Sequence, residues 1–245
     1  MAEYSGTRTR FRIAGRSEST SVAALDAIIS RMNERRFTRI DRFLSGLDDI
    51  LRGIAGTPAH PERPNPGARV GSGTLTAKER RHVAGLMRVN HAGEVAAQGL
   101  YHGHGIVARD AGIVQQMQAA AAEERDHLAW CEQRLRELDA RPSRLRPVWY
   151  AGAWLIGAAS GVLGDRWSLG FVEETERQVA EHLGGHLDSL PADDARSRAI
   201  VRQMRADEER HGAEARTAGA CELPAPVRRL MRMSAKLMTR TSYRW

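Results

Sequence analysis

The chain has 245 residues, enough for one sizeable domain with extensions, and it is rich in Ala, Arg, Leu and Glu. Few aromatic residues and few β-branched runs occur, which favours helices and argues against a β-sheet protein. The formal net charge is +7, and residues 226–245 carry six basic groups and no acidic one, while the middle of the chain is mildly acidic. A basic excess confined to the ends suits an anionic membrane surface better than a nucleic-acid cleft, so no nucleic-acid partner is expected.

The first 73 residues are predicted to be an N-terminal extension. No apolar core marks a secretory signal, and residues 1–20 are expected to be disordered. Apolar residues recur at helical spacing over about 21–54, and a Pro- and Gly-rich linker follows over 55–73.

Residues 74–220 are predicted to form the main domain from two helical hairpins. The first hairpin starts at Thr76, where Glu79 completes a capping box, and it runs to about Leu138. Its turn is placed near Arg109–Asp110.

The second hairpin is predicted from about Val148 to Ala218, with a turn beside Pro191. Its first helix is expected to continue directly from the uncharged stretch 147–164. That stretch is about the shortest plausible membrane span and contains four glycines, so we interpret it as a buried or interfacial helix. Aromatic residues around it suit either a membrane interface or plain core packing: Trp149, Tyr150, Trp154 and Trp167. Residues 221–245 are predicted to form a basic amphipathic C-terminal helix.

Each hairpin carries a lone glutamate and, about thirty residues later, a Glu-x-x-His. Residues i and i+3 share a helix face, so this Glu and His can bind one metal ion. The midpoints of the two glutamate pairs fall at residues 109 and 192, beside turns that were placed from turn chemistry alone. In an antiparallel hairpin such pairs lie at the same height, so all six residues are predicted to meet in one core. The six residues are Glu94, Glu124, His127, Glu176, Glu208 and His211.

Four glutamates and two histidines suit a carboxylate-bridged di-iron or di-manganese centre. Four unpaired buried carboxylates would be strongly destabilising, whereas two divalent cations cancel their charge. Zinc is disfavoured because six mostly oxygen ligands exceed its usual tetrahedron. The alternative is that these residues form surface ion pairs with arginines such as Arg125 or Arg210.

Other residues have plainer interpretations. A third Glu-x-x-His, from Glu79 to His82, lies about 22 Å before Glu94 along the helix and is interpreted as a solvated first turn. Tyr101 could abut the site, but a core tyrosine is favoured. Cys131 is expected to be a buried free thiol.

The positions of the remaining histidines do not indicate that they bind the metal. His182 either orients a metal ligand by contacting it, without binding the metal itself, or is a partly exposed helical residue. His102, His104 and His186 are expected to face solvent.

Four segments resemble the demethoxyubiquinone hydroxylase family of ubiquinone biosynthesis, whose fold is ferritin-like. They are LMRVNHAGEVAAQGLYHGH (86–104), EERDHLAWCEQRL (123–135), the long stretch 141–183 and DEERHGAEA (207–215). The resemblance places Glu94 at the family's first ligand, Glu124 with His127 at the next two, and Glu208 with His211 at the last two. Glu176 becomes the fourth ligand because a helical histidine, His182, follows at the family's spacing. Glu173 and Glu174 are nearby rivals, but helical phase prefers Glu176.

The resemblance implies an all-α, ferritin-like four-helix bundle with two iron ions per chain. It implies a monooxygenase that uses O₂ to hydroxylate the ring of a prenylated demethoxyubiquinol, with no catalytic residue assigned beyond the metal centre. The expected location is peripheral, on the cytoplasmic face of a bacterial inner membrane or, in a eukaryote, the matrix side of the mitochondrial inner membrane. Partner proteins of ubiquinone biosynthesis and a homo-oligomer are both compatible with it.

Two other functions are weighed against this one. The first is a ferritin- or bacterioferritin-like iron oxidation or storage protein, which would need a soluble, cage-forming exterior. The second is a non-enzymatic membrane-associated helical bundle in which the six residues form ion pairs.

Overall fold

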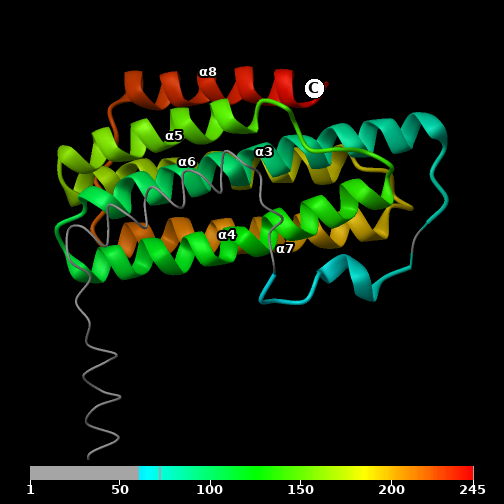
Figure 1. The fold of residues 1–245 in the computed structure, drawn as a ribbon, viewed down its shortest axis with the longest axis horizontal. Coiled ribbons are helices and arrows are strands. Elements are labelled where there is room, and N and C mark those ends of the chain that lie inside the picture. Colours follow the sequence, from blue (N-terminus) through cyan, green and yellow to red (C-terminus); the bar gives the residue numbers. More distant parts are fainter. Residues whose placement is uncertain (1–60, 72, 245) are drawn as a thin grey trace, which may run out of the picture. The chain divides into compact units, whose positions relative to one another are not determined.

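The computed structural model describes residues 61–71 and 73–244, and within them the chain is entirely helical (Figure 1). This confirms the all-α prediction. The helix predicted over 21–54 lies outside the described residues. The domain boundaries at 73/74 and 220/221 stay predictions. The elements are a short 3-10 helix and six α-helices: η1 (Pro66–Arg69), α3 (Ala77–Val107), α4 (Ala111–Glu137), α5 (Arg146–Val162), α6 (Asp165–Ser189), α7 (Ala195–Thr217) and α8 (Ala225–Ser242).

The helix ends of the two hairpins follow the capping chemistry in the sequence. Thr76 and Glu79 form the predicted capping box at the start of α3, with the Thr76 amide 2.8 Å from Glu79 Oε2. Asp110 caps α4 by accepting from the amides of the next turn, which confirms the turn predicted near residue 109. Asp194 caps α7 three residues after Pro191, which confirms the second turn.

The prediction of one unbroken helix from Val148 onward was wrong. The chain ends α5 at Val162 and restarts as α6 at Asp165, with Gly164 between them at a φ of 116°. Only glycine adopts this backbone region at low cost, so Gly164 permits the break. The Asp165 carboxylate then accepts from the amides of Arg109 and Asp110 at 3.3 and 3.1 Å, which ties the start of α6 to the α3–α4 turn.

Glycines allow α3 and α5 to approach backbone to backbone. A Cβ added at Gly99 or Gly103 of α3 would overlap carbonyl oxygens of α5, and one added at Gly157 would overlap the Leu100 carbonyl oxygen. Side chains would force the two helices apart, so this spacing of small residues fixes α5 against α3.

Two apolar clusters fill the bundle on either side of its middle. One cluster includes Met87, Trp130, Leu183 and Met204, and it lies toward one end of α3, α4, α6 and α7. The other draws on the opposite ends of the same four helices. The helical turns that lie between the two clusters carry the six predicted site residues. The second cluster comprises Ala97, Tyr101, Met117, Ala120, Ala121, Leu169, Val172 and Ala215.

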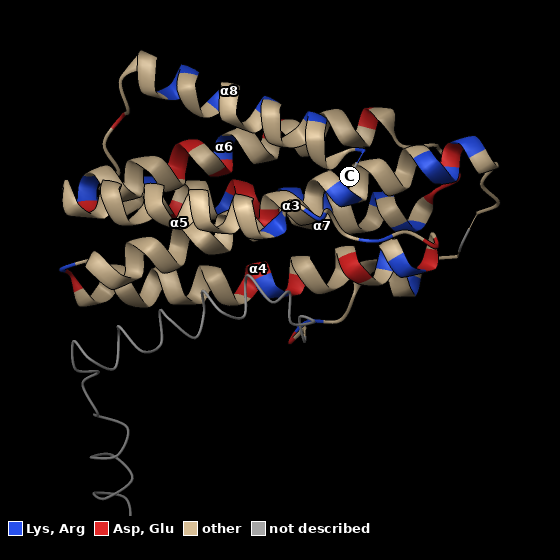
Figure 2. Ribbon diagram, turned by 45° about the horizontal axis from the view of Figure 1, so that its top comes forward, with Lys and Arg blue, Asp and Glu red and all other residues tan. Residues whose placement is uncertain are grey.

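Large apolar side chains are exposed on the outer faces of α5 and α8. Leu155 of α5 and Leu163, which follows its last residue, are 62% and 66% exposed. Leu230 and Leu237 of α8 are 64% and 59% exposed. Basic residues are spaced along α8, and the body of α5 is uncharged (Figure 2). Within residues 61–71 and 73–244, no helix has the length and apolar character needed to cross a membrane. The sequence interpretation of α5 as something other than a span is therefore confirmed.

Candidate metal centre

Four helices each present one turn of polar side chains to the same buried point between the two apolar clusters. α3 supplies Glu94, α4 supplies Glu124 and His127, α6 supplies Glu176, and α7 supplies Glu208 and His211. None of the six is more than 3% exposed. They form two groups able to hold a metal ion, and both groups contain Glu124 and Glu208. Glu94 and His127 complete the first group; Glu176 and His211 complete the second.

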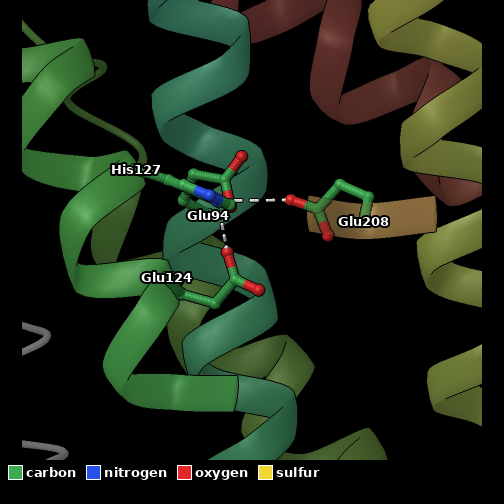
Figure 3. A group of neighbouring side chains, drawn as sticks. All are labelled: Glu94, Glu124, His127 and Glu208. Carbon is green, nitrogen blue, oxygen red and sulfur yellow. Dashed lines mark hydrogen bonds and ion pairs between the residues drawn. The ribbon is translucent and has the colours of Figure 1, made fainter. Parts of the chain in front are cut away.

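The first group is centred on the Nδ1 atom of His127 (Figure 3). This nitrogen lies 2.8 Å from Glu124 Oε2, 3.3 Å from Glu208 Oε1 and 3.6 Å from Glu94 Oε2. The three glutamates come from three different helices, and all three point toward the same imidazole.

The second group mirrors the first around His211. Its Nδ1 atom lies 3.3 Å from Glu124 Oε1 and 3.8 Å from Glu208 Oε2. Each shared glutamate therefore directs one oxygen to each histidine. Glu124 and Glu208 could thus each contribute to both of two metal positions.

The outward Nε2 atom of each histidine meets an acidic side chain. His127 Nε2 lies 3.0 Å from Asp207 Oδ2, and His211 Nε2 lies 3.6 Å from Glu123 Oε2. With a metal ion at Nδ1, the Nε2–H of His127 would donate to Asp207, because a carboxylate can only accept a hydrogen bond. The longer contact with Glu123 leaves His211 Nε2 outside hydrogen-bond distance. The His127 ring is thus oriented as a metal ligand would be.

The six buried groups strongly perturb one another's pKa values. Burial, together with repulsion from Glu124 and Glu208, raises the pKa of Glu94 well above its usual value, and the same causes raise the pKa of Glu176. Burial also disfavours the charged form of Glu124, but its contacts with His127 hold its pKa well below the usual range. Burial lowers the pKa of His211, yet its contacts with Glu124 and Glu208 raise it to about 10 overall.

Among the residues that the structure describes, several polar atoms at the centre find no hydrogen-bond partner. These atoms include one oxygen each of Glu124, Glu176 and Glu208 and both ring nitrogens of His211. Unsatisfied buried polar atoms cost free energy, and here they converge on one point. The donor set of carboxylates and imidazoles therefore fits two divalent cations of the iron or manganese type.

Comparison with known proteins agrees with this geometry. Residues 81–242 match the family model described as ubiquinone biosynthesis protein COQ7. The chain belongs to the COQ7 family. Over 84% of its length it is 55% identical to a 3-demethoxyubiquinol 3-hydroxylase of Ralstonia pickettii, of which 99% is covered. It is 58% identical to one of Cupriavidus taiwanensis and 54% identical to one of Chromobacterium violaceum, again over 84% of this chain and 99% or more of each relative.

The rival glutamates of this COQ7-family chain lie outside both groups. Glu173 pairs with Arg216, and Glu174 pairs with Arg177 at 2.8 Å. Arg210, proposed above as a surface partner, pairs instead with Glu123 and Glu214. The interpretation of the six residues as surface ion pairs is therefore wrong, because they are buried and face one another.

Two of the histidine predictions were wrong. His104 and His186 were expected to face solvent, but they are 0% and 6% exposed. His104 is covered because α5 packs closely on α3, a contact that helical periodicity within α3 could not reveal. His182 lines a cavity that also includes His186 and residues of α3 and α8, and it belongs to neither group. The third Glu-x-x-His is also apart from the centre, since His82 contacts Tyr243 OH at 2.8 Å.

Three residues near the centre were not identified from the sequence as part of it. Tyr101, expected to be a core residue, is 1% exposed and also donates a hydrogen bond from its hydroxyl to Glu176 Oε1. Asp207 and Glu123 each precede a shared glutamate by one residue. Because Asp207 and Glu123 occupy the same position in the two halves of the internal repeat, that repeat could have identified both as neighbours of the site.

Proposed function

We propose that this chain is a 3-demethoxyubiquinol 3-hydroxylase of ubiquinone biosynthesis, with two iron ions held by the six residues of the centre. The observation that carries the proposal is the pair of buried Glu/His groups that share Glu124 and Glu208. Relatives of 54–58% identity, matched over nearly their whole length, are named for this activity. The reaction makes the chain an oxidoreductase.

The metal assignment rests on charge and donor type. Four carboxylates offset the charge of two divalent cations, and bound cations would counter the burial and mutual repulsion that raise the pKa of Glu94 and Glu176. Two ferrous ions bound there would supply the electrons and the open coordination positions that O₂ activation needs. The Nδ1 atoms of His127 and His211 would complete one ligand set each.

The surrounding residues control water and protons. The apolar clusters above and below the centre exclude bulk water, which protects reactive oxygen chemistry from side reactions. Tyr101 keeps its proton, since burial and the nearby carboxylates raise its pKa well above the usual value. Its hydroxyl hydrogen bond therefore holds Glu176 in a fixed orientation.

The substrate class accounts for the apolar outer surface. A prenylated quinol resides in a lipid bilayer, and the exposed apolar residues of α5 and α8 would enter the headgroup region beside it. The six basic groups of residues 226–245 would add attraction to anionic lipids. We therefore infer peripheral association with the membrane that contains the quinone.

The deciding experiment is genetic. In a strain that lacks its own hydroxylase, Glu208→Ala should fail to restore ubiquinone and should leave the demethoxy precursor in the cells. Glu209→Ala is the matched control, because the neighbouring Glu209 side chain is 56% exposed and pairs with Arg205 on the surface of α7. Normal ubiquinone in the Glu208→Ala strain would refute the proposal.

The storage alternative makes a different prediction about metal load. A hydroxylase should contain about two irons per chain, whereas a ferritin-like store should hold very many per particle. Iron analysis of the purified chain separates the two.

A further inference from the structure

A segment that precedes the first bundle helix lies against the outside of the proposed metal centre. Residues 61–71 pass over α4 and α7, the two helices that supply the histidines. Asn65 donates to Gln133 of α4 at 2.9 Å. A Cβ added at Gly67 would lie 3.1 Å from the Arg196 carbonyl oxygen of α7. The segment is therefore packed closely on both helices.

Arg63 reaches from this segment to the carboxylates behind His127. Its Nε atom donates to Asp126 Oδ2 at 2.6 Å, and one of its terminal nitrogens donates to Asp207 Oδ2 at 2.9 Å. The guanidinium also stacks 5.0 Å from the ring centroid of Trp130, whose Nε1–H donates to the Arg63 carbonyl oxygen at 3.3 Å. Its amide contacts Asp126 at 3.3 Å, one terminal nitrogen lies 3.4 Å from His127 Nε2, and a longer ion pair reaches Glu123 Oε2 at 3.5 Å. These contacts together fix its position.

The internal repeat explains why an arginine is needed from outside. In α7, Arg210 follows the shared Glu208 by two residues and pairs with Glu123, the acid behind His211. In α4, the residue two after the shared Glu124 is an acid, Asp126. Arg210 also reaches Asp207, but at Oδ1 and 3.3 Å, whereas Arg63 donates to Oδ2, the oxygen that faces His127.

We propose that Arg63 is a positioning residue for the metal position formed by Glu94 and His127. It holds Asp207, and Asp207 in turn accepts the Nε2 proton of His127 at 3.0 Å. This chain of contacts would hold the His127 ring so that Nδ1 faces the metal position between Glu94, Glu124 and Glu208. The inference rests on the proposed metal centre, and it gives residues 61–71 a part in metal affinity.

The test is a metal titration of the full chain after metal removal, under anaerobic conditions, with Co²⁺ as the probe. The unchanged chain should bind about two equivalents. Arg63→Gln should weaken one equivalent by about 10- to 100-fold, the usual effect of removing a group that orients a ligand. It should weaken the other equivalent much less, because Arg63 reaches the His211 side only through its 3.5 Å ion pair with Glu123. Arg69→Gln, at an exposed arginine of the same segment, is the matched control.

Two further variants distinguish positioning from general support of the fold. Arg63→Lys keeps the charge but not the two-pronged geometry, so it should restore affinity only in part. In an Asp207→Asn background, Arg63→Gln should have a smaller effect than in the unchanged chain, because only the direct 3.4 Å contact of Arg63 with His127 Nε2 remains to be lost. The Co²⁺ d–d absorption of the affected position should change with Arg63→Gln.

The outcomes separate this inference from the function on which it rests. If the unchanged chain binds no metal, both fail. If it binds two equivalents and Arg63→Gln binds them equally well, only the role of Arg63 is overturned. Equal weakening of both equivalents, or additive effects of Arg63→Gln and Asp207→Asn, would also overturn it.

Discussion

His104 should make the stability of this protein depend on pH in a way that one substitution removes. Its Nε2 lies 2.5 Å from Ser160 Oγ, and the Ser160 hydroxyl donates to the Gly157 carbonyl oxygen at 3.0 Å. The Ser160 oxygen must therefore accept from His104 Nε2–H. The Nδ1 atom is buried and has no hydrogen-bond partner within residues 61–71 and 73–244, so a second proton there would be neither hydrated nor hydrogen-bonded. Burial accordingly lowers the pKa of His104 to about 3.

The size of the effect follows from proton linkage. An unfolded histidine has a pKa of about 6.5, so between pH 6.5 and 3 the unfolded chain binds a proton that the folded chain does not. The contribution is fully present above pH 6.5 and is lost as the pH falls toward 3. At about 1.4 kcal/mol per pH unit, lowering the pH from 7 to 5 should cost about 2 kcal/mol from His104 alone, and lowering it to 4 about 3 kcal/mol.

His104→Gln isolates this contribution, because a carboxamide can donate to Ser160 but does not titrate. Urea unfolding of both chains at pH 7 and pH 5 gives four free energies of unfolding. The unchanged chain should lose about 2 kcal/mol more than His104→Gln between the two pH values. Other buried histidines, such as His186, cancel in this comparison. Equal losses in the two chains would show that folded His104 does take up the proton, and the reasoning would be refuted.

Three other predictions concern the centre, the helix packing and the surface. Glu124→Ala should reduce tightly bound divalent ions from about two per chain to below one, because Glu124 belongs to both groups, whereas Glu94→Ala should leave about one; equal losses by elemental analysis would contradict the shared role. Gly157→Ala should destabilise the chain by about 1–3 kcal/mol, since its Cβ overlaps backbone of α3. Gly152→Ala, in open space on the same helix, should be neutral or stabilising by up to about 1 kcal/mol, and matching unfolding temperatures for the two would refute the packing argument. Leu237→Asp should weaken binding to anionic vesicles about tenfold or more in a sedimentation assay, given the transfer free energy of a leucine side chain, and unchanged binding would exclude α8 as a contact.

The sequence predicted those features that arise within one helix or across one turn. Helical phase placed Glu176 inward and Glu173 outward, and capping chemistry at Asp110 and Asp194 placed both turns. These two facts were enough to bring all six site residues to one height. Helical periodicity identified the inward face of each bundle helix, because the site residues are charged or polar interruptions of otherwise apolar stripes.

Contacts between helices far apart in the sequence were beyond this reasoning. The burial of His104 depends on α5, and the break at Gly164 depends on a left-handed backbone that a neighbouring turn holds in place. Arg63 lies in a Pro- and Gly-rich stretch with no periodicity to interpret. Its partners come from two separate helices, so nothing local to residue 63 indicated the contact.

The glycine contact between α3 and α5 also affects how freely this protein can change. The contact is made largely by backbone atoms at Gly99, Gly103 and Gly157, and the outward side chains of α5 take no part in it. Substitutions on that outer face can therefore accumulate or be engineered without altering the distance between the two helices. A surface matched to another bilayer composition could be selected while the ligands on α3 stay where they are.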